Sequence, residues 1–298
     1  MVARMFVAIL VSFILFLSSA VAANGPAMQD PVPAITIPPI GETQELTLRD
    51  GTRAFGRVER VENGRVTFRT TSGAVIEVET AQIVAIRSVE GSVNGREFWP
   101  QDPNPTRLFF APTGRSLQRG TGYFGVYEIL LPFVQVGITD RVSFGGGTPL
   151  IFGGGSEHPF WITPKVQVLN AKSTQIAVGV MHFMNVGDGS LGIAYGVATL
   201  GSADSAVTVG VGRAYERSYG NSHGATLLMV GGEHRATRKI KLITENYVFR
   251  SGGVAMGGIR LLGDSLSADI GLVVPLGVGE LIAFPMVNFV WKFGKAVR

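Results

Sequence analysis

The sequence predicts an all-β protein, an antiparallel transmembrane β-barrel of about twelve strands preceded by a small β-domain. Three observations predict this fold. Only 16% of the 298 residues are charged and 40 are glycine, a composition that disfavours long surface helices. After residue 17, no run of about 20 apolar residues long enough for a membrane helix occurs. From residue 106 onward, stretches of about ten residues that alternate between large apolar and polar or small side chains are separated by turns.

The amino terminus is typical of an exported protein. In residues 1–23, Arg4 precedes an apolar core at 5–17 and small residues at 18–23, which is the pattern of a cleaved signal peptide. Residues 24–42 contain five prolines and are expected to be a linker. The chain has no cysteine, which excludes disulfides, cysteine metal sites and a lipoprotein anchor.

Residues 43–91 are predicted to form a separate small β-domain. Short alternating runs are divided by the turn signals Asp50-Gly51, Asn63-Gly64 and Ser72-Gly73. This pattern resembles SH3-like and Sm-like small barrels. Seven arginines are matched by seven acidic residues, so we expect a protein-contacting or spacer module and no nucleic-acid partner. Its predicted core is Leu46, Leu48, Val58, Val66, Phe68, Val75, Val78, Ile83 and Ile86.

A proline-rich linker, residues 92–105, is expected to lead into the barrel, residues 106–298. An even strand number would place both termini and the small domain in the periplasm, beside the short turns. Residues 120–139 are too long for one regular strand, so a bulge near 130–132 or a division into two strands is expected. The predicted strands are 106–113, 120–139, 141–152, 159–171, 174–185, 190–201, 205–216, 224–236, 238–250, 253–263, 266–277 and 281–293.

The two faces of these strands differ in a way that favours lipid outside the barrel. One face is apolar and the other consists of polar or small residues, whereas a soluble sandwich would carry many charges on its outer face. The predicted lipid faces include Ile176, Val178 and Val180; Leu191, Ile193, Tyr195 and Val197; Val207, Val209 and Val211; and Ala268, Ile270, Leu272 and Val274.

Two segments carry a resemblance to bacterial outer-membrane barrels. The stretch VQVGITDRVSFGGG at 134–147 resembles their strand–turn–strand unit, and 235–249 is similar. The resemblance implies an outer-membrane location, contact with outer-membrane lipid, and insertion by the barrel assembly machinery. The alternating residues Val287, Phe289, Trp291 and Phe293 resemble the C-terminal strand that this machinery recognises.

Chemistry is sparse in this sequence. None of the four histidines has a serine two residues later, the spacing of known barrel hydrolases, so we expect no enzyme, cofactor or metal site. Charges in the lumen either set ion preference in a passive channel for small polar solutes or pair and close it. The alternative to a channel is a structural or docking protein whose small domain binds a periplasmic partner. An outer-membrane enzyme is a distant third hypothesis. The predicted lumen-lining residues are Lys165, Gln167, Lys241, Glu245, Asp269, Asn288 and Lys292.

Overall fold

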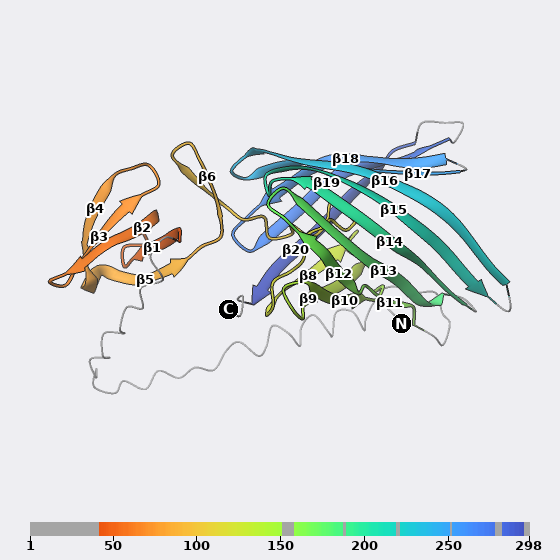
Figure 1. Cartoon of the computed structure of the whole chain (residues 1–298), viewed down its shortest axis with the longest axis horizontal. Coiled ribbons are helices and arrows are strands. Elements are labelled where there is room, and N and C mark those ends of the chain that lie inside the picture. Colours follow the sequence, from red (N-terminus) through yellow and green to blue (C-terminus); the bar gives the residue numbers. More distant parts are fainter. Residues whose placement is uncertain are drawn as a thin grey trace, which may run out of the picture.

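The fold was determined as a computed structural model of the whole chain (Figure 1). It describes residues 42–150, 158–186, 189–218, 221–250, 252–277 and 282–294. The predicted signal peptide and almost all of the first linker lie outside the described residues. Within the described ranges, no helix has the length and apolar character needed to cross a membrane.

The small domain is a five-stranded antiparallel sheet with the order β4-β3-β2-β1-β5. Its core lies where the alternation predicted it, because seven of the nine predicted residues form one buried cluster. Leu48 packs at the edge of that cluster. Val75 is 48% exposed, so its assignment to the core was wrong. The elements are β1 (Gln44–Leu48), β2 (Arg53–Glu62), β3 (Arg65–Thr70), β4 (Val75–Glu79), η1 (Thr80–Gln82) and β5 (Ile83–Ser88).

The second predicted linker, 92–105, is instead ordered. Most of it belongs to a hairpin of β6 (Gly91–Asn94) and β7 (Glu97–Pro100). The hairpin and the small domain contact the short-turn end of the barrel: the Ser92 hydroxyl donates to Asp204 at 2.6 Å, and Arg53 pairs with Asp264 at 3.0 Å. Proline did not prevent this hairpin because Pro100 lies at the last position of its strand.

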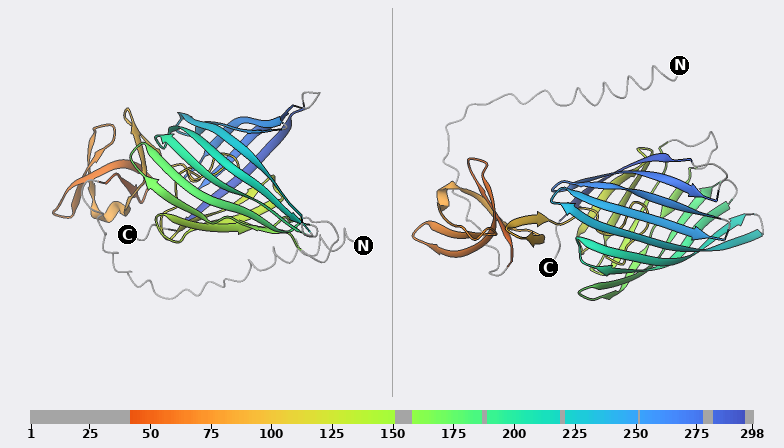
Figure 2. Two further views of the ribbon diagram at one scale, coloured as in Figure 1. Left: turned by 45° about the vertical axis from the view of Figure 1, so that its right-hand side comes forward. Right: turned by 90° about the horizontal axis from the view of Figure 1, so that it is seen from above.

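The rest of the chain forms a closed antiparallel barrel of twelve strands (Figure 2). It closes because β20 pairs with β8, and β9 pairs with both β8 and β10. β11 and β12 act as one strand interrupted at Pro164, since both pair with β10 and β13. The strands are β8 (Thr121–Tyr127), β9 (Leu131–Gly137), β10 (Val142–Gly147), β11 (Phe160–Ile162), β12 (Lys165–Asn170), β13 (Thr174–Val186), β14 (Gly189–Gly201), β15 (Ser205–Ser218), β16 (Asn221–Thr237), β17 (Ile240–Phe249), β18 (Gly252–Leu262), β19 (Leu266–Leu276) and β20 (Phe284–Gly294).

The predicted number of strands is confirmed, although one predicted strand was wrong and another is divided, which is one of the two alternatives expected for it. Residues 106–113 are not a barrel strand and lie inside the lumen. Residues 120–139 are two strands, β8 and β9, joined by a turn at 128–130. That turn was hard to recognise because Glu128 and Ile129 both adopt positive φ (49° and 64°), a conformation usually taken by glycine, asparagine or aspartate.

The barrel is apolar outside and polar inside. Large apolar side chains are exposed on the outer face of strand after strand, as at Val178, Val209 and Ile270. Buried charged side chains project inward instead. Residues 191–198 are an exception to the predicted faces, because Tyr195 and Val197 pack against the core inside the lumen. The prediction of a strand with alternating faces was right for these residues, but the inner and outer faces were exchanged. Both faces of this stretch carry only apolar and small residues, so the sequence does not distinguish them.

Candidate functional site in the barrel lumen

The lumen is occupied by the chain's own residues 101–119, here called the plug. The plug enters from the end of the barrel that faces the small domain and continues into β8 (Figure 1). Its residues are buried almost throughout, with Asn104, Leu108, Phe109 and Thr113 at 0–1% exposure. A twelve-strand barrel is wider than its own wall side chains can fill, and the plug occupies the lumen at the end that faces the small domain.

The centre of the plug is a tight hairpin. Thr113 N donates to Thr106 O, and Leu108 N donates to Ala111 O, both at 2.9 Å. The tip is held by Glu245 of β17, whose carboxylate accepts the backbone N–H groups of residues 109, 110 and 111 at 2.8–3.1 Å. Tyr247 also donates to Glu245, at 2.6 Å. This one carboxylate therefore satisfies three backbone donors that would otherwise be buried without partners.

Arg260 of β18 holds the plug through its backbone carbonyls. The guanidinium is fully buried and forms a two-point ion pair with Asp269 of β19, at 2.6 and 3.0 Å. It also donates to Asn104 O at 2.6 Å, to Leu108 O, and to Asp102 at 3.1 Å. A guanidinium offers five N–H donors in a fixed fork, and this geometry joins two wall strands to three points of the plug.

A second ionic group ties the start of the plug to β16 and β17. Lys241 Nζ donates to Asp102 at 2.7 Å and to Glu233 at 2.9 Å. Arg115 forms an ion pair with the same Glu233. Burial alone would raise the pKa of Asp102, but the attraction of Lys241 and Arg260 outweighs burial and lowers it below its usual range. Asp102 is therefore a carboxylate that links two wall cations.

The polar wall residues of β12 and β14 bind plug backbone as well. Lys165 Nζ donates to the carbonyls of Arg115 at 2.6 Å and Thr106 at 3.2 Å. Gln167 donates to Gly114 O at 2.8 Å, and Gly114 N donates to Thr199 Oγ1 at 2.8 Å. Gly114 has no room for a side chain here, since a Cβ would lie 2.1 Å from Gln175 O.

Apolar packing completes the plug's contacts. Leu108, Phe109 and Ala111 form one buried cluster with wall residues including Ala177 and Met229. The small residues of the wall make room for this packing, because a Cβ on Gly231 would lie 2.3 Å from Leu108 Cδ1. Small wall residues would leave space in an empty lumen, and here the plug occupies that space.

The predicted lumen residues lie on the inner side of the wall, and six of the seven are at least nine-tenths buried. Lys165, Gln167, Lys241 and Glu245 contact the plug directly, and Asp269 does so through Arg260. Asn288 is buried beside β8, while Lys292 is half-buried and donates to Gln101 at 3.2 Å. Missed by the sequence reasoning were Arg107, Arg115, Glu233 and Arg260.

Two of these missed residues carried a signal in the sequence. Arg260 is the single charge of an otherwise apolar or small strand, and Glu233 lies with Arg235 on the inner face of β16, in both cases on the phase of the inner face. The plug arginines carried none, because Arg107 lies in a segment with the composition of a wall strand and Arg115 lies just after it. Within the described parts of the chain, no group of three or more possible metal ligands occurs.

The C-terminal residues lie on the opposite side of the wall. Phe289, Trp291 and Phe293 of β20 are all exposed on the outer face, while Met286, Asn288 and Val290 are buried. Their recognition by assembly machinery stays a prediction.

Comparison with known proteins supplies no family for this chain. No family model matches it, and no curated protein matches it. Among solved structures it is similar to a loop-deletion mutant of OmpT, an outer membrane protein of Vibrio cholerae. The match has a TM-score of 0.38 and 12% identity over 84% of this chain and 96% of the other. A likeness at this level carries no argument about function.

Proposed function

We propose that the protein is a bacterial outer-membrane β-barrel that anchors a periplasmic β-domain, and that its plug keeps the lumen closed. The observation that carries this proposal is the hydrogen bonding of the plug. Arg260 donates to three plug residues, Glu245 accepts three plug N–H groups, and Lys241 donates to Asp102 of the plug, all from the neighbouring strands β17 and β18. Such a network is costly to break, because separating one partner leaves the other charged and buried.

The outer face supports a membrane location. Monomeric soluble proteins rarely expose contiguous apolar patches larger than a few hundred Å². Here large apolar residues are exposed on the outside of every part of the barrel, including Phe144, Leu228, Leu272 and Trp291. Lipid is the solvent that makes such a surface stable.

The arrangement of the ends supports a periplasmic small domain. The small domain and its hairpin contact Asp204, Arg238 and Asp264, which lie in three short turns of the barrel. In outer-membrane barrels the short turns lie on the periplasmic side. The five-stranded sheet is then displayed beneath the membrane, where a periplasmic protein can reach it.

An anchor suits this geometry better than a passive channel for small solutes. A passive channel needs a continuous water path, and the plug fills the lumen at the end where solutes would leave. The charges predicted to tune ion preference contact the plug instead.

Electrical recording tests the closure. The purified full-length protein in planar bilayers is expected to show no discrete conductance steps. A double variant, Glu245→Ala with Arg115→Ala, removes plug contacts without touching the hydrogen bonds between wall strands, and it is expected to produce steps. The matched control is Glu59→Ala with Arg69→Ala, which removes a surface ion pair of the small domain.

The outcomes separate the hypotheses. Steps in the unmodified protein would favour the passive channel. Silence in the plug variant, with its barrel shown to be folded, would mean that something other than the plug closes the lumen. Membrane location is tested separately by fractionation and by the faster gel migration of unheated barrels. Complete extraction by carbonate would contradict the barrel's place in lipid.

A further inference from the structure

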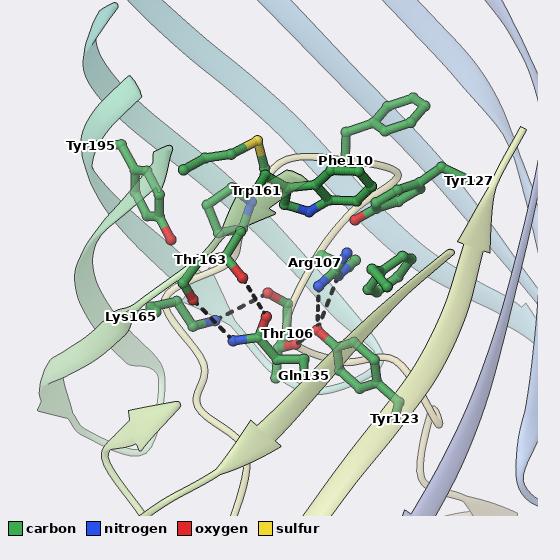
Figure 3. A pocket seen from close by; sticks show the side chains of 13 residues that line it. Thr106, Arg107, Phe110, Tyr123, Tyr127, Gln135, Trp161, Thr163, Lys165 and Tyr195 are labelled. Carbon is green, nitrogen blue, oxygen red and sulfur yellow. Dashed lines mark hydrogen bonds between the residues drawn. The ribbon is translucent and has the colours of Figure 1, made fainter. Parts of the chain in front are cut away.

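One flank of the plug borders a small cavity inside the barrel (Figure 3). Its volume is about 40 Å³, and its walls come from the plug and from β8, β9, β11, β12, β13 and β14. One water molecule needs about 10–15 Å³ by this measure, so the cavity has room for about three waters or one small polyatomic ion. Six of the thirteen lining residues are aromatic, and two are cations, Arg107 and Lys165.

The charge around this cavity is not balanced. Arg107 of the plug and Lys165 of β12 are both buried, yet among the described residues neither has a carboxylate within 4.0 Å. The other buried cations that hold the plug each have a carboxylate partner, as Arg260 has Asp269. A buried charge without a counter-charge is costly. Two of them facing one cavity indicate that a negative charge belongs there.

Not all N–H donors of the Arg107 guanidinium are used. Its Nε donates to the Tyr123 hydroxyl at 3.0 Å, and its guanidinium lies 4.4 Å from the centre of the Phe133 ring. Nη2 is bonded to the same hydroxyl. Nη1 has no acceptor within the part of the chain that the structure describes. Lys165 differs, because its three donors all reach plug carbonyls, so its contribution to the cavity is its charge.

Tyr127 supplies an independent observation. It is 6% exposed, and its hydroxyl is buried without a hydrogen-bond partner among the described residues. In Figure 3 this hydroxyl points into the cavity, towards Arg107. Buried hydroxyls are normally paired, and an orphaned one calls for a missing partner.

We infer that this cavity binds a small oxyanion, such as inorganic phosphate, sulfate or a small carboxylate. Nη1 of Arg107 and the hydroxyl of Tyr127 donate to separate oxygen atoms, and the charge of Lys165 stabilises the anion from behind. Charge-assisted bonds from a guanidinium suit an oxyanion, which offers several acceptors in fixed directions. The aromatic walls exclude water and so strengthen these bonds. This site goes beyond the anchoring role and would exist in a channel as well.

The decisive variant is Tyr127→Phe. It removes an oxygen that has no partner in the protein, so a merely structural tyrosine should tolerate the change. The full-length protein in detergent is titrated with phosphate, sulfate and acetate by calorimetry. Tyr127→Phe is expected to weaken binding about tenfold, the effect of losing one bond to a charged group. Arg107→Gln is expected to weaken it at least about a hundredfold.

The control is Tyr215→Phe, which removes a hydroxyl bonded to His182, away from the cavity. It should leave anion affinity unchanged. A preference for phosphate and sulfate over acetate would identify a tetrahedral anion, and the reverse preference a carboxylate. The inference is overturned if none of the three anions binds, or if Tyr127→Phe binds them as the unmodified protein does. The second result would point to a water molecule between Tyr127 and its neighbour Asn288, whose Nδ2 also lacks a partner. The Arg107→Gln result is used only if gel migration shows that this variant forms a folded barrel. If it does not fold, the Tyr127→Phe result alone tests the inference.

Discussion

The small domain and the barrel are both built from alternating strands, but they bury opposite chemistry. The small domain encloses Val66 and Phe68 and exposes its charges, whereas the barrel encloses Lys241 and Arg260 and exposes its valines. An alternating sequence indicates that the two faces of a strand differ in polarity, but it does not indicate which face is buried. The solvent outside each unit decides which face is buried, and the two units of this chain require different solvents.

The largest expected effect comes from removing a buried cation. Arg260→Met should destabilise the barrel by about 3–5 kcal/mol, because Asp269 and the plug carbonyls would be left buried without their donor. Arg69→Met in the small domain should cause no measurable change, since Arg69 and Glu59 form a solvent-exposed pair. Urea titration in lipid vesicles, followed by gel migration, measures the first change. Circular dichroism of the same protein measures the second.

Equal losses in the two variants would contradict the contrast. So would a stable Arg260→Met barrel that remains closed in bilayers, because the plug would then not depend on this residue.

Two exposed valines sharpen the comparison of solvents. Val84 of the small domain is 56% exposed and Val211 of the barrel is 53% exposed. Val211→Lys should cost about 2–4 kcal/mol if that surface faces the bilayer centre. Val84→Lys should change stability by less than about 0.5 kcal/mol, as surface substitutions in water usually do. The same urea titration measures both. A neutral Val211→Lys variant would indicate that water covers this part of the barrel.

A third prediction concerns the C-terminal strand. Replacing Trp291 and Phe293 together by glutamine should lower the assembled fraction severalfold, because the outer face of β20 loses two aromatic contacts with lipid. The matched control is Phe55→Gln with Trp99→Gln, two aromatic residues at the small-domain end. The assembled fraction is the share of protein in the outer membrane that migrates fast on unheated gels. Normal assembly of the Trp291 and Phe293 variant would mean that these residues do not act as an assembly signal.

Much of the barrel could be predicted from the sequence because its turns and alternation are local. The strand count was right because the error at 106–113 is offset by the division of 120–139 into two strands, one of the two alternatives expected there. The error had a physical cause. The plug sequence TRLFFAPT has strand-like composition, and its place inside the lumen depends on bonds to Glu245 and Arg260, more than 130 residues away. The division of 120–139 could not be assigned with certainty from the sequence, because the turn at 128–130 contains no glycine, asparagine or aspartate.

The candidate site was predictable in part because the alternation of a strand is a local pattern. An inward charge such as Lys241 could be found from its phase on a polar strand face. Its partner could not, because Asp102 lies in a segment that looks like a proline-rich linker. The reversed phase at Tyr195 has a physical cause: where both faces carry only small and apolar residues, alternation leaves the choice of face open.

The smallest expected effect appears only in acid and compares two aspartates. Burial raises the pKa of Asp102, but the positive charges of Lys241 and Arg260 lower it by more. The pKa of Asp50 is lowered mainly by the hydrogen bond from the backbone N–H of Thr52. A carboxylate with a depressed pKa stabilises the fold above its unfolded value of about 3.9, and this contribution is lost as the pH falls through the folded pKa. The contribution of Asp102 to barrel stability, measured as the difference between the unmodified protein and Asp102→Asn, should therefore be constant from about pH 8 to pH 5 and decline only below about pH 4. The small domain should respond less, because Asp50 is exposed to solvent. Urea midpoints of the two units, measured from pH 8 to pH 3, test this. A difference between the unmodified protein and Asp102→Asn that shrinks between pH 7 and pH 5 would mean that Asp102 is not held as a carboxylate by the two cations.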